Sequence, residues 1–268
     1  MQDNALTLID ALKPWPPPVE NIIIPWRLLS KSDYDFYREL IERSRPHLKA
    51  LTVRVNEFGW LDPDEKPSEE LARELFGHSH GEYGGSPLVL RDINFQNQNL
   101  GLFEKTWRHY IDFTKLRTLQ VWNCPGVDKL LRGLINLTQH EPLQLEGLVL
   151  SFEDDYHSPK LTEEFLTSFS GLRYLNLCYD PCDRYVCFNM PAMRSHVNTI
   201  QDLYIGIGAN YHSAGIKLWA PDFRDSVWMV QHCRKLRQLA IALPKVSISD
   251  VLKGNLGEYE SRLVSKMY

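Results

Sequence analysis

Residues 116 to 124 of this chain read Leu-Arg-Thr-Leu-Gln-Val-Trp-Asn-Cys, with apolar residues at Leu116, Leu119 and Val121 and a thiol at Cys124. If Leu116 is counted as offset 0, the apolar residues stand at offsets 0, 3 and 5, and the thiol at offset 8. The same apolar pattern occurs at seven other places. These copies begin at Val19, Leu48, Leu90, Leu145, Leu172, Ile200 and Leu236. We therefore expect eight segments of one kind.

The spacing of the copies identifies the kind of repeat. Successive copies begin 29, 42, 26, 29, 27, 28 and 36 residues apart. Five of these seven steps lie within the 20 to 29 residue period of leucine-rich repeats, whose strands carry this apolar pattern. The sequence predicts an α/β fold, a leucine-rich-repeat solenoid or horseshoe of about eight irregular repeats. Its parallel β-sheet is expected on the concave side, with helices outside.

Alternate side chains of a strand point to opposite sides, so offsets 3 and 5 share one face and offsets 2, 4 and 6 share the other. We expect the first set to be a core that is continuous between neighbouring repeats. The expected core includes Leu119, Val121, Leu148, Leu150, Leu175 and Leu177. Replacing Leu148 with Ala is expected to cost about 2–5 kcal/mol, because the side chain would be packed between two neighbours.

The chain is interpreted as a single leucine-rich-repeat domain over residues 1–268. Two insertions, 56–87 and 206–221, lengthen the repeat, and residues 245–268 are expected to form a C-terminal cap. Gly171 stands where a helix C-cap is expected before the next strand. Helical patterns are expected at about 5–12, 33–44, 69–76, 102–113, 127–138, 162–169, 191–197, 222–235 and 258–267.

Composition narrows the function classes. The 268 residues carry a net charge of −4 with no basic excess, so nucleic-acid binding lacks its usual electrostatic basis. No apolar stretch approaches the ~18 residues that span a bilayer, so no membrane association is expected. Five cysteines are odd in number and scattered, which is typical of a reducing compartment. We expect a cytoplasmic or nuclear protein.

A metal site is the first chemical alternative. Cys178, Cys182 and Cys187 lie close in sequence with two aspartates between them, and His212 or Cys233 could complete a set of ligands. Structural zinc sites favour two pairs of matching C-x2–4-C spacing, and no second pair is present in the sequence. Ordinary thiols are the favoured interpretation, and no metal is expected.

A second alternative is a catalytic or metal site at His78, His80 and Glu82. Glycines and polar residues surround these side chains, as in a surface loop, whereas catalytic geometry requires rigid support. The sequence contains no phosphate-binding glycine loop, nucleophile elbow or H-E-x-x-H motif. We therefore expect no enzyme, no catalytic residue and no cofactor. An enzyme or metal-binding protein that uses one of these two loops remains the alternative.

The residues at offsets 2, 4 and 6 are expected to carry the function. Among these 24 positions there are one arginine and two aspartates, whereas 24% of the whole chain is charged. Depletion of charge together with aromatic and amide side chains is typical of the centre of a protein interface. We expect a protein partner on the concave face. The predicted contact residues are Arg54, Asn94, Gln96, Gln120, Trp122, Tyr174, Asn176 and Tyr204.

The irregular repeats, the strand that ends in Asn123-Cys124 and the aromatic-rich helices resemble the degenerate leucine-rich-repeat half of fungal F-box proteins. The resemblance covers about residues 19–244. It implies a substrate receptor of an SCF-type ubiquitin ligase, in which the repeats hold the protein to be ubiquitinated. The F-box itself is not found in this sequence. Adaptor binding is therefore expected only if an F-box lies upstream in a longer product, as a first helix without its own strand suggests.

Overall fold

The structure is a computed structural model that describes residues 17–26, 31–55, 68–76, 86–105, 107–152, 159–179, 190–207 and 223–241. The chain divides into two compact units, Met1–Gly133 (unit 1) and Leu134–Tyr268 (unit 2), and the division lies within helix α5, Val127–Thr138. The interpretation of residues 1–268 as one domain is not tested by this division and stays a prediction. The helices expected at 5–12 and 258–267 and the cap at 245–268 lie outside the described residues.

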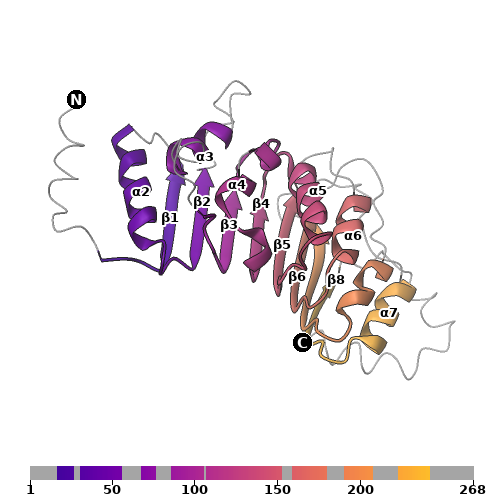
Figure 1. Cartoon of the computed structure of the whole chain (residues 1–268). Coiled ribbons are helices and arrows are strands. Elements are labelled where there is room, and N and C mark those ends of the chain that lie inside the picture. Colours follow the sequence, from indigo (N-terminus) through magenta and orange to yellow (C-terminus); the bar gives the residue numbers. More distant parts are fainter. Residues whose placement is uncertain are drawn as a thin grey trace. The chain divides into compact units, whose positions relative to one another are not determined.

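Unit 1 contains a parallel sheet whose strands pair in chain order (Figure 1). Its strands are β1 (Asn21–Trp26), β2 (Ala50–Val55), β3 (Asp92–Gln96) and β4 (Thr118–Trp122). Its helices are α2 (Lys31–Ser44), α3 (Ser68–Phe76) and α4 (Trp107–Tyr110), with 3-10 turns η2 (Phe103–Lys105) and η3 (Phe113–Lys115). α2 contacts α3, and α3 contacts α4.

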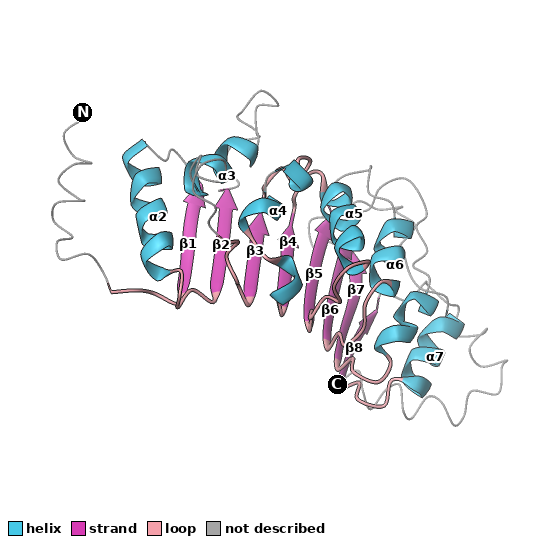
Figure 2. Cartoon of the chain, viewed as in Figure 1, coloured by secondary structure: helices cyan, strands magenta, loops and turns pink. Residues whose placement is uncertain are grey.

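Unit 2 repeats this plan with its own parallel strands in chain order (Figure 2). Its strands are β5 (Gly147–Phe152), β6 (Tyr174–Tyr179), β7 (Asp202–Ile207) and β8 (Gln238–Ile241). Its helices are α6 (Pro159–Thr167), the 3-10 helix η4 (Met190–His196) and α7 (Phe223–His232). The α/β class, all eight predicted strands and their parallel pairing within each unit are confirmed.

The apolar repeat places the core as predicted. Leu119, Val121 and their counterparts at offsets 3 and 5 in β5 and β6 are at most 1% exposed. Each strand begins two residues after the first apolar position, yet in seven of the eight repeats that residue is buried too, as Leu116 and Leu172 show; Val19 of the first repeat is half-buried. Hydrogen bonding between neighbouring repeats already starts at offset 1, since the Arg173 N–H donates to the Glu146 carbonyl at 2.7 Å. In these repeats the residue at offset 0 therefore belongs to the core and lies just before the start of the strand.

Large aromatic side chains fill the layer between the strands and the helices of unit 1. The Trp107 ring of α4 lies 4.8 Å from the Phe95 ring of β3 and 6.0 Å from the Phe76 ring of α3, edge to face in both cases. Phe103 and Phe113 make a similar contact at 4.8 Å. Such pairs add roughly 0.5–1.5 kcal/mol each to the free energy gained by burying their area. One helix thus joins the sheet to the neighbouring helix.

The turns that follow β3 and β4 are built alike. Asn97 and Asn123, one residue past each strand, have φ of 55° and 52°, the left-handed region in which asparagine is enriched. The Asn97 N–H donates to the Trp122 carbonyl at 2.9 Å, and the Gln98 N–H donates to the Cys124 thiol at 3.3 Å. The thiol at offset 8 is therefore a buried acceptor that connects one turn to the next.

Two details of the helical predictions were wrong. Residues 102–113 do not form one helix, because Ile111 leaves the helical path to bridge Leu88, and the Asp112 carboxylate then caps η3 by accepting from the Thr114 N–H at 3.0 Å. The helical segment expected at about 191–197 is present as the 3-10 helix η4, whose rise per residue is greater than that of an α-helix. Gly171 has φ of 102°, but it lies four residues past α6 and is not its C-cap.

A buried histidine organises the core of unit 2. His196 is fully buried; its Nδ1 accepts the Leu172 N–H at 3.3 Å, and its Nε2 lies 2.9 Å from the Leu166 carbonyl oxygen, which can only accept. The ring is therefore neutral with its proton on Nε2. Burial lowers its pKa from 6.5 to about 4, against the opposing effect of the Leu166 hydrogen bond. This one side chain connects η4 to α6 and to the start of β6.

Candidate protein-binding faces

The strands of unit 1 present a polar face on the side opposite to their core. It consists of three rows of side chains that the parallel register places side by side across β1 to β4. We call these twelve residues the polar face. The rows are Asn21, Ala50, Asp92 and Thr118; Ile23, Thr52, Asn94 and Gln120; and Pro25, Arg54, Gln96 and Trp122. None of the twelve residues is buried.

The polar face is poor in charge, and its two charged residues differ. Asp92 lies 3.8 Å from the Arg91 guanidinium, so its charge is partly neutralised. Arg54 is exposed and forms no ion pair or hydrogen bond with any residue in the described part of the chain. A guanidinium carries five N–H donors, and none of them is engaged by a described residue, so they can serve an external acceptor.

Carboxamide and indole groups surround Arg54 on this face. Gln96 is its direct neighbour in the register, and Trp122 follows on the next strand. The Trp122 indole N–H lies at 3.4 Å from the Gln120 side-chain oxygen, a long contact, and no partner among the described residues reaches the Asn94 side-chain oxygen. Half-buried amides whose hydrogen-bonding capacity is incompletely used suit a ligand that offers both donors and acceptors.

Unit 2 presents a different face, which is dominated by two tyrosines. The Tyr174 and Tyr204 rings lie 5.7 Å apart at an angle of 46°. Asn176 is the register partner of Tyr204, as predicted, and its amide lies 3.5 Å from the Tyr174 hydroxyl. The Tyr204 hydroxyl donates to the Gln238 side-chain oxygen. Desolvation raises the pKa of Tyr204, and Asp202 and Tyr174 raise it further, so the phenol is protonated at neutral pH.

The strand β5 departs from the expected outward face. Gly147, Val149 and Ser151 were expected to be accessible at offsets 2, 4 and 6, but all six residues of β5 are buried. In the register these three residues lie beside Tyr174, Asn176 and Cys178 of β6. The accessible face of unit 2 therefore starts at β6.

The structure thus places the eight predicted contact residues in two groups. Arg54, Asn94, Gln96, Gln120 and Trp122 lie on the polar face, and Tyr174, Asn176 and Tyr204 lie together on the face of unit 2. Nothing in the structure tests whether they bind a partner. Sequence reasoning assigned Thr52 and Gln238 to the outward side of their strands but did not include them among the contact residues; Thr52 lies between Ile23 and Asn94, and Gln238 accepts from Tyr204. Their offsets, 4 and 2, were the signal that could have found both residues.

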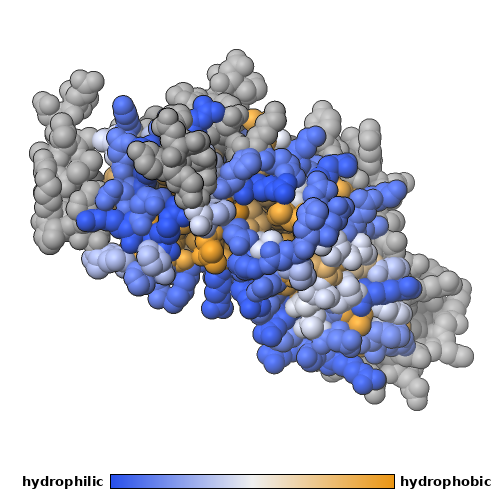
Figure 3. Space-filling model, viewed as in Figure 1, coloured by the Kyte–Doolittle hydropathy of each residue, from blue (hydrophilic) through white to orange (hydrophobic). Residues whose placement is uncertain are grey.

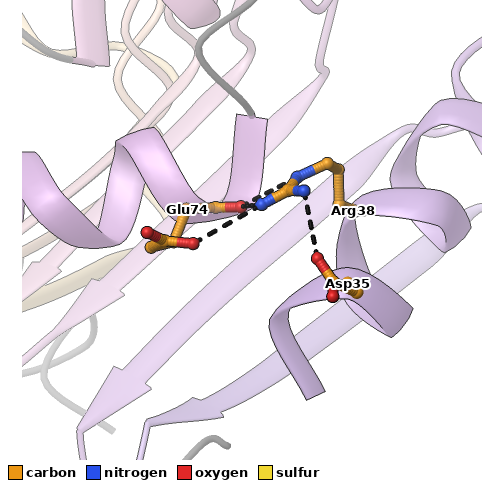
Figure 4. Close-up of polar contacts among 3 residues, drawn as sticks. All are labelled: Asp35, Arg38 and Glu74. Carbon is orange, nitrogen blue, oxygen red and sulfur yellow. Dashed lines mark hydrogen bonds and ion pairs between the residues drawn. The ribbon is translucent and has the colours of Figure 1, made fainter. Parts of the chain in front are cut away.

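The helices of unit 1 carry a cluster of charges whose role is structural. Arg38 of α2 donates from Nε to the Glu74 backbone carbonyl at 3.0 Å, in the last turn of α3 (Figure 4). The same guanidinium forms ion pairs with Asp35 at 3.1 Å and with the Glu74 carboxylate at 3.5 Å. Cationic donors stabilise the C-terminal carbonyls of helices. Arg38 therefore satisfies the end of α3 and connects α2 to it.

The two chemical alternatives fall mostly outside the described residues. His78, His80, Glu82, Cys182, Cys187 and His212 all lie there. Cys178 is half-buried in β6, and Cys233 is buried beside Met229. In the part of the chain that the structure describes, no three His, Cys, Asp or Glu side chains are grouped so that they could hold a metal ion.

The helical side of the molecule offers little apolar surface among the described residues. In the view of Figure 3, hydrophobic colour occupies small areas between hydrophilic residues. Among the residues whose burial is described, the exposed large apolar side chains are Ile23 on the polar face and Val89 before β3, at 65% and 62%. No helix among the described residues has both the length and the apolar character needed to cross a bilayer.

Comparison with known proteins found no matching family model, no similar curated protein and no similar solved structure.

Proposed function

We propose that this chain is a leucine-rich-repeat solenoid that recognises another protein through the strand faces opposite to its helices. The observation that carries the proposal is the contrast between the two sides of each strand. Offsets 3 and 5 are buried and apolar, whereas in the strands other than β5 the opposite side is accessible, carries few charges and, on β3, β4, β6 and β7, holds amide or aromatic groups. Interfaces are enriched in aromatic side chains and depleted of most charged ones in this way.

The rigidity of these faces favours binding. Trp122 and Tyr204 each stand on a strand whose alternate side chains are anchored in the core. Large amphipathic side chains on a rigid support lose little conformational entropy when they are covered, which is why they dominate interface energetics. A protein partner is therefore favoured over a small ligand, and we propose no catalytic residue, cofactor or nucleic-acid partner.

The resemblance to the repeat half of fungal F-box proteins extends the proposal. The turn after β4, where the Cys124 thiol accepts from the preceding turn, is consistent with a stacked repeat of this type. In this interpretation the chain holds the protein to be ubiquitinated by an SCF-type ligase, in the cytoplasm or nucleus. An adaptor would bind only through an F-box encoded upstream, which reading the genomic region before Met1 in frame would reveal.

Affinity capture with two face variants tests the binding proposal. Trp122→Ala and Tyr204→Ala each remove a half-buried aromatic ring, so each is expected to weaken partner binding by about 2 kcal/mol or more, with little change in thermal stability. Proteins captured by the wild type should be depleted at least tenfold by the double variant, as measured by quantitative mass spectrometry.

A matched control keeps the strand faces intact. Arg132→Ala in α5 and Glu164→Ala in α6 change two exposed helical side chains and should leave the captured set unchanged. Equal recovery by the face double variant and the wild type would place the functional surface elsewhere. The insertion at 56–87 would then be the next surface to test.

A further inference from the structure

The proposed function does not specify which chemical class of ligand the polar face binds. Arg54 indicates this class. It is the single cation among the twelve residues of that face, and it has no partner in the described part of the chain. An arginine that no described residue pairs with, beside half-buried amides, marks a position where an anion is favoured.

We propose that the polar face of unit 1 binds an extended, acidic peptide segment of the partner through Arg54, Gln96 and Trp122. The inference rests on the proposed function and names its ligand class. The anion is a carboxylate, because one guanidinium can satisfy a carboxylate with two parallel hydrogen bonds. Phosphorylated motifs are held by clusters of arginines, and this face has one.

The register fixes the spacing of the motif. Arg54 and Trp122 lie in the same row on β2 and β4, with Gln96 of β3 between them. Neighbouring strands are ~4.8 Å apart, so these two positions are separated by roughly 10 Å. A polyproline II peptide has three residues per turn and rises ~3.1 Å per residue, so residues three apart lie on one side about 9 Å from each other.

A peptide that crosses the strands in this conformation would therefore place an acidic side chain on Arg54 and an apolar or aromatic side chain, three positions away, on Trp122. Its backbone N–H and C=O groups form no internal hydrogen bonds. Gln96 lies directly beneath that backbone, and Asn94 and Gln120 follow in the adjacent row. A carboxamide both donates and accepts, so it can bond peptide groups in either chain direction.

Selection from a displayed library of random 12-residue peptides tests the motif. Wild-type chain is expected to enrich Asp or Glu three positions from an aromatic or large aliphatic residue, in one or both orders. Arg54→Glu should replace the acidic residue by Lys or Arg while keeping the spacing. Arg132→Glu makes the same charge change on an exposed position of α5 and should select the wild-type motif.

Affinities of one selected peptide complete the test. Fluorescence anisotropy should show binding at least about tenfold weaker for Arg54→Ala and for Trp122→Ala than for wild type, with unchanged circular dichroism spectra. Replacing the acidic residue of the peptide by its amide should cause a similar loss. A phosphoserine peptide that binds more tightly than the Asp peptide would overturn the choice of carboxylate.

The outcomes separate this inference from the proposed function. The acidic-peptide inference is wrong if Arg54→Glu and wild type select the same peptides, even when those peptides still require Trp122. If no peptide is selected in a Trp122-dependent manner and partner capture is also unaffected by Trp122→Ala and Tyr204→Ala, both the inference and the proposed binding faces are wrong.

Discussion

Acidification should destabilise the chain through His196. The ring is neutral in the fold because Leu172 donates to Nδ1 and the Leu166 carbonyl accepts from Nε2, and its pKa is about 4. In the unfolded chain an ordinary histidine titrates near 6.5. Between these two values the unfolded state binds more protons than the folded state, so the free energy of unfolding falls as pH is lowered through this window.

The size of this loss of stability follows from the pKa difference of His196 between the folded and unfolded states. A difference of ~2.5 pKa units corresponds to roughly 3 kcal/mol, since each unit represents ~1.4 kcal/mol. The stability is fully present above about pH 6.5, and most of it is lost by about pH 4.5. Below about pH 4 both states are protonated and no further change is expected from this residue.

Urea unfolding of wild type and of His196→Gln at several pH values between 7 and 4 would measure the pH-dependent contribution of His196 to the free energy of unfolding. Glutamine can keep one donor and one acceptor but does not titrate, so the difference between the two proteins cancels the contributions of carboxylates. That difference should shrink by about 2–3 kcal/mol from pH 7 to pH 4.5. The other described histidines are exposed, so they offer no substitute. Parallel pH profiles for the two proteins would refute the buried, neutral role of His196.

Three substitutions test the packing described above, all measured by thermal unfolding. Leu175→Ala in β6 should cost about 2–5 kcal/mol, because its side chain is fully buried, whereas the neighbouring Asn176→Ala on the opposite face should cost under about 1 kcal/mol; equal costs would contradict the assignment of the two faces. Gly126→Ala should cost about 1–3 kcal/mol, since φ is 78° there and a Cβ would lie 2.4 Å from the Gly101 nitrogen; a neutral result would mean that this turn is not the one described. Arg38→Ala should cost about 1 kcal/mol, a modest value because the ion pairs are partly exposed, and Arg38→Lys should restore little of it because one ammonium cannot reproduce the guanidinium contacts.

Periodicity predicted the strands because every core position faces a stacked neighbour. The positions of Leu119 and Val121, offsets 3 and 5, must be apolar in every repeat. The pattern can therefore be recognised even where the spacing between repeats is irregular. The helix expected at 102–113 failed for the opposite reason. Phe103, Trp107 and Ile111 have helical spacing, but the pairing of Ile111 with Leu88 depends on a residue more than 20 positions away. Such a tertiary contact leaves no local signal.

For the candidate site, the sequence predicted which face each residue lies on but not how accessible each residue is. Alternation assigned Arg54, Gln96 and Trp122 to one face and one row, and the register confirms this placement. Alternation could not reveal that Val149 is only 4% exposed, because alternation assigns a side chain to one side of the strand and does not say whether that side is covered. Nor could it show that Arg54 has no partner among the described residues, because that is a property of the folded chain.

Site-specific photocrosslinking tests the central claim, that the strand faces bind a partner protein, most directly. A photoreactive phenylalanine analogue would be placed at Gln96 or Asn176 on the faces, and at Arg132 or Lys160 on helices, all positions that are at least partly accessible. After irradiation in cells, the two face positions should yield crosslinked proteins that the helix positions do not. Crosslinks from the helix positions alone, or identical products from all four positions, would contradict recognition through the strand faces.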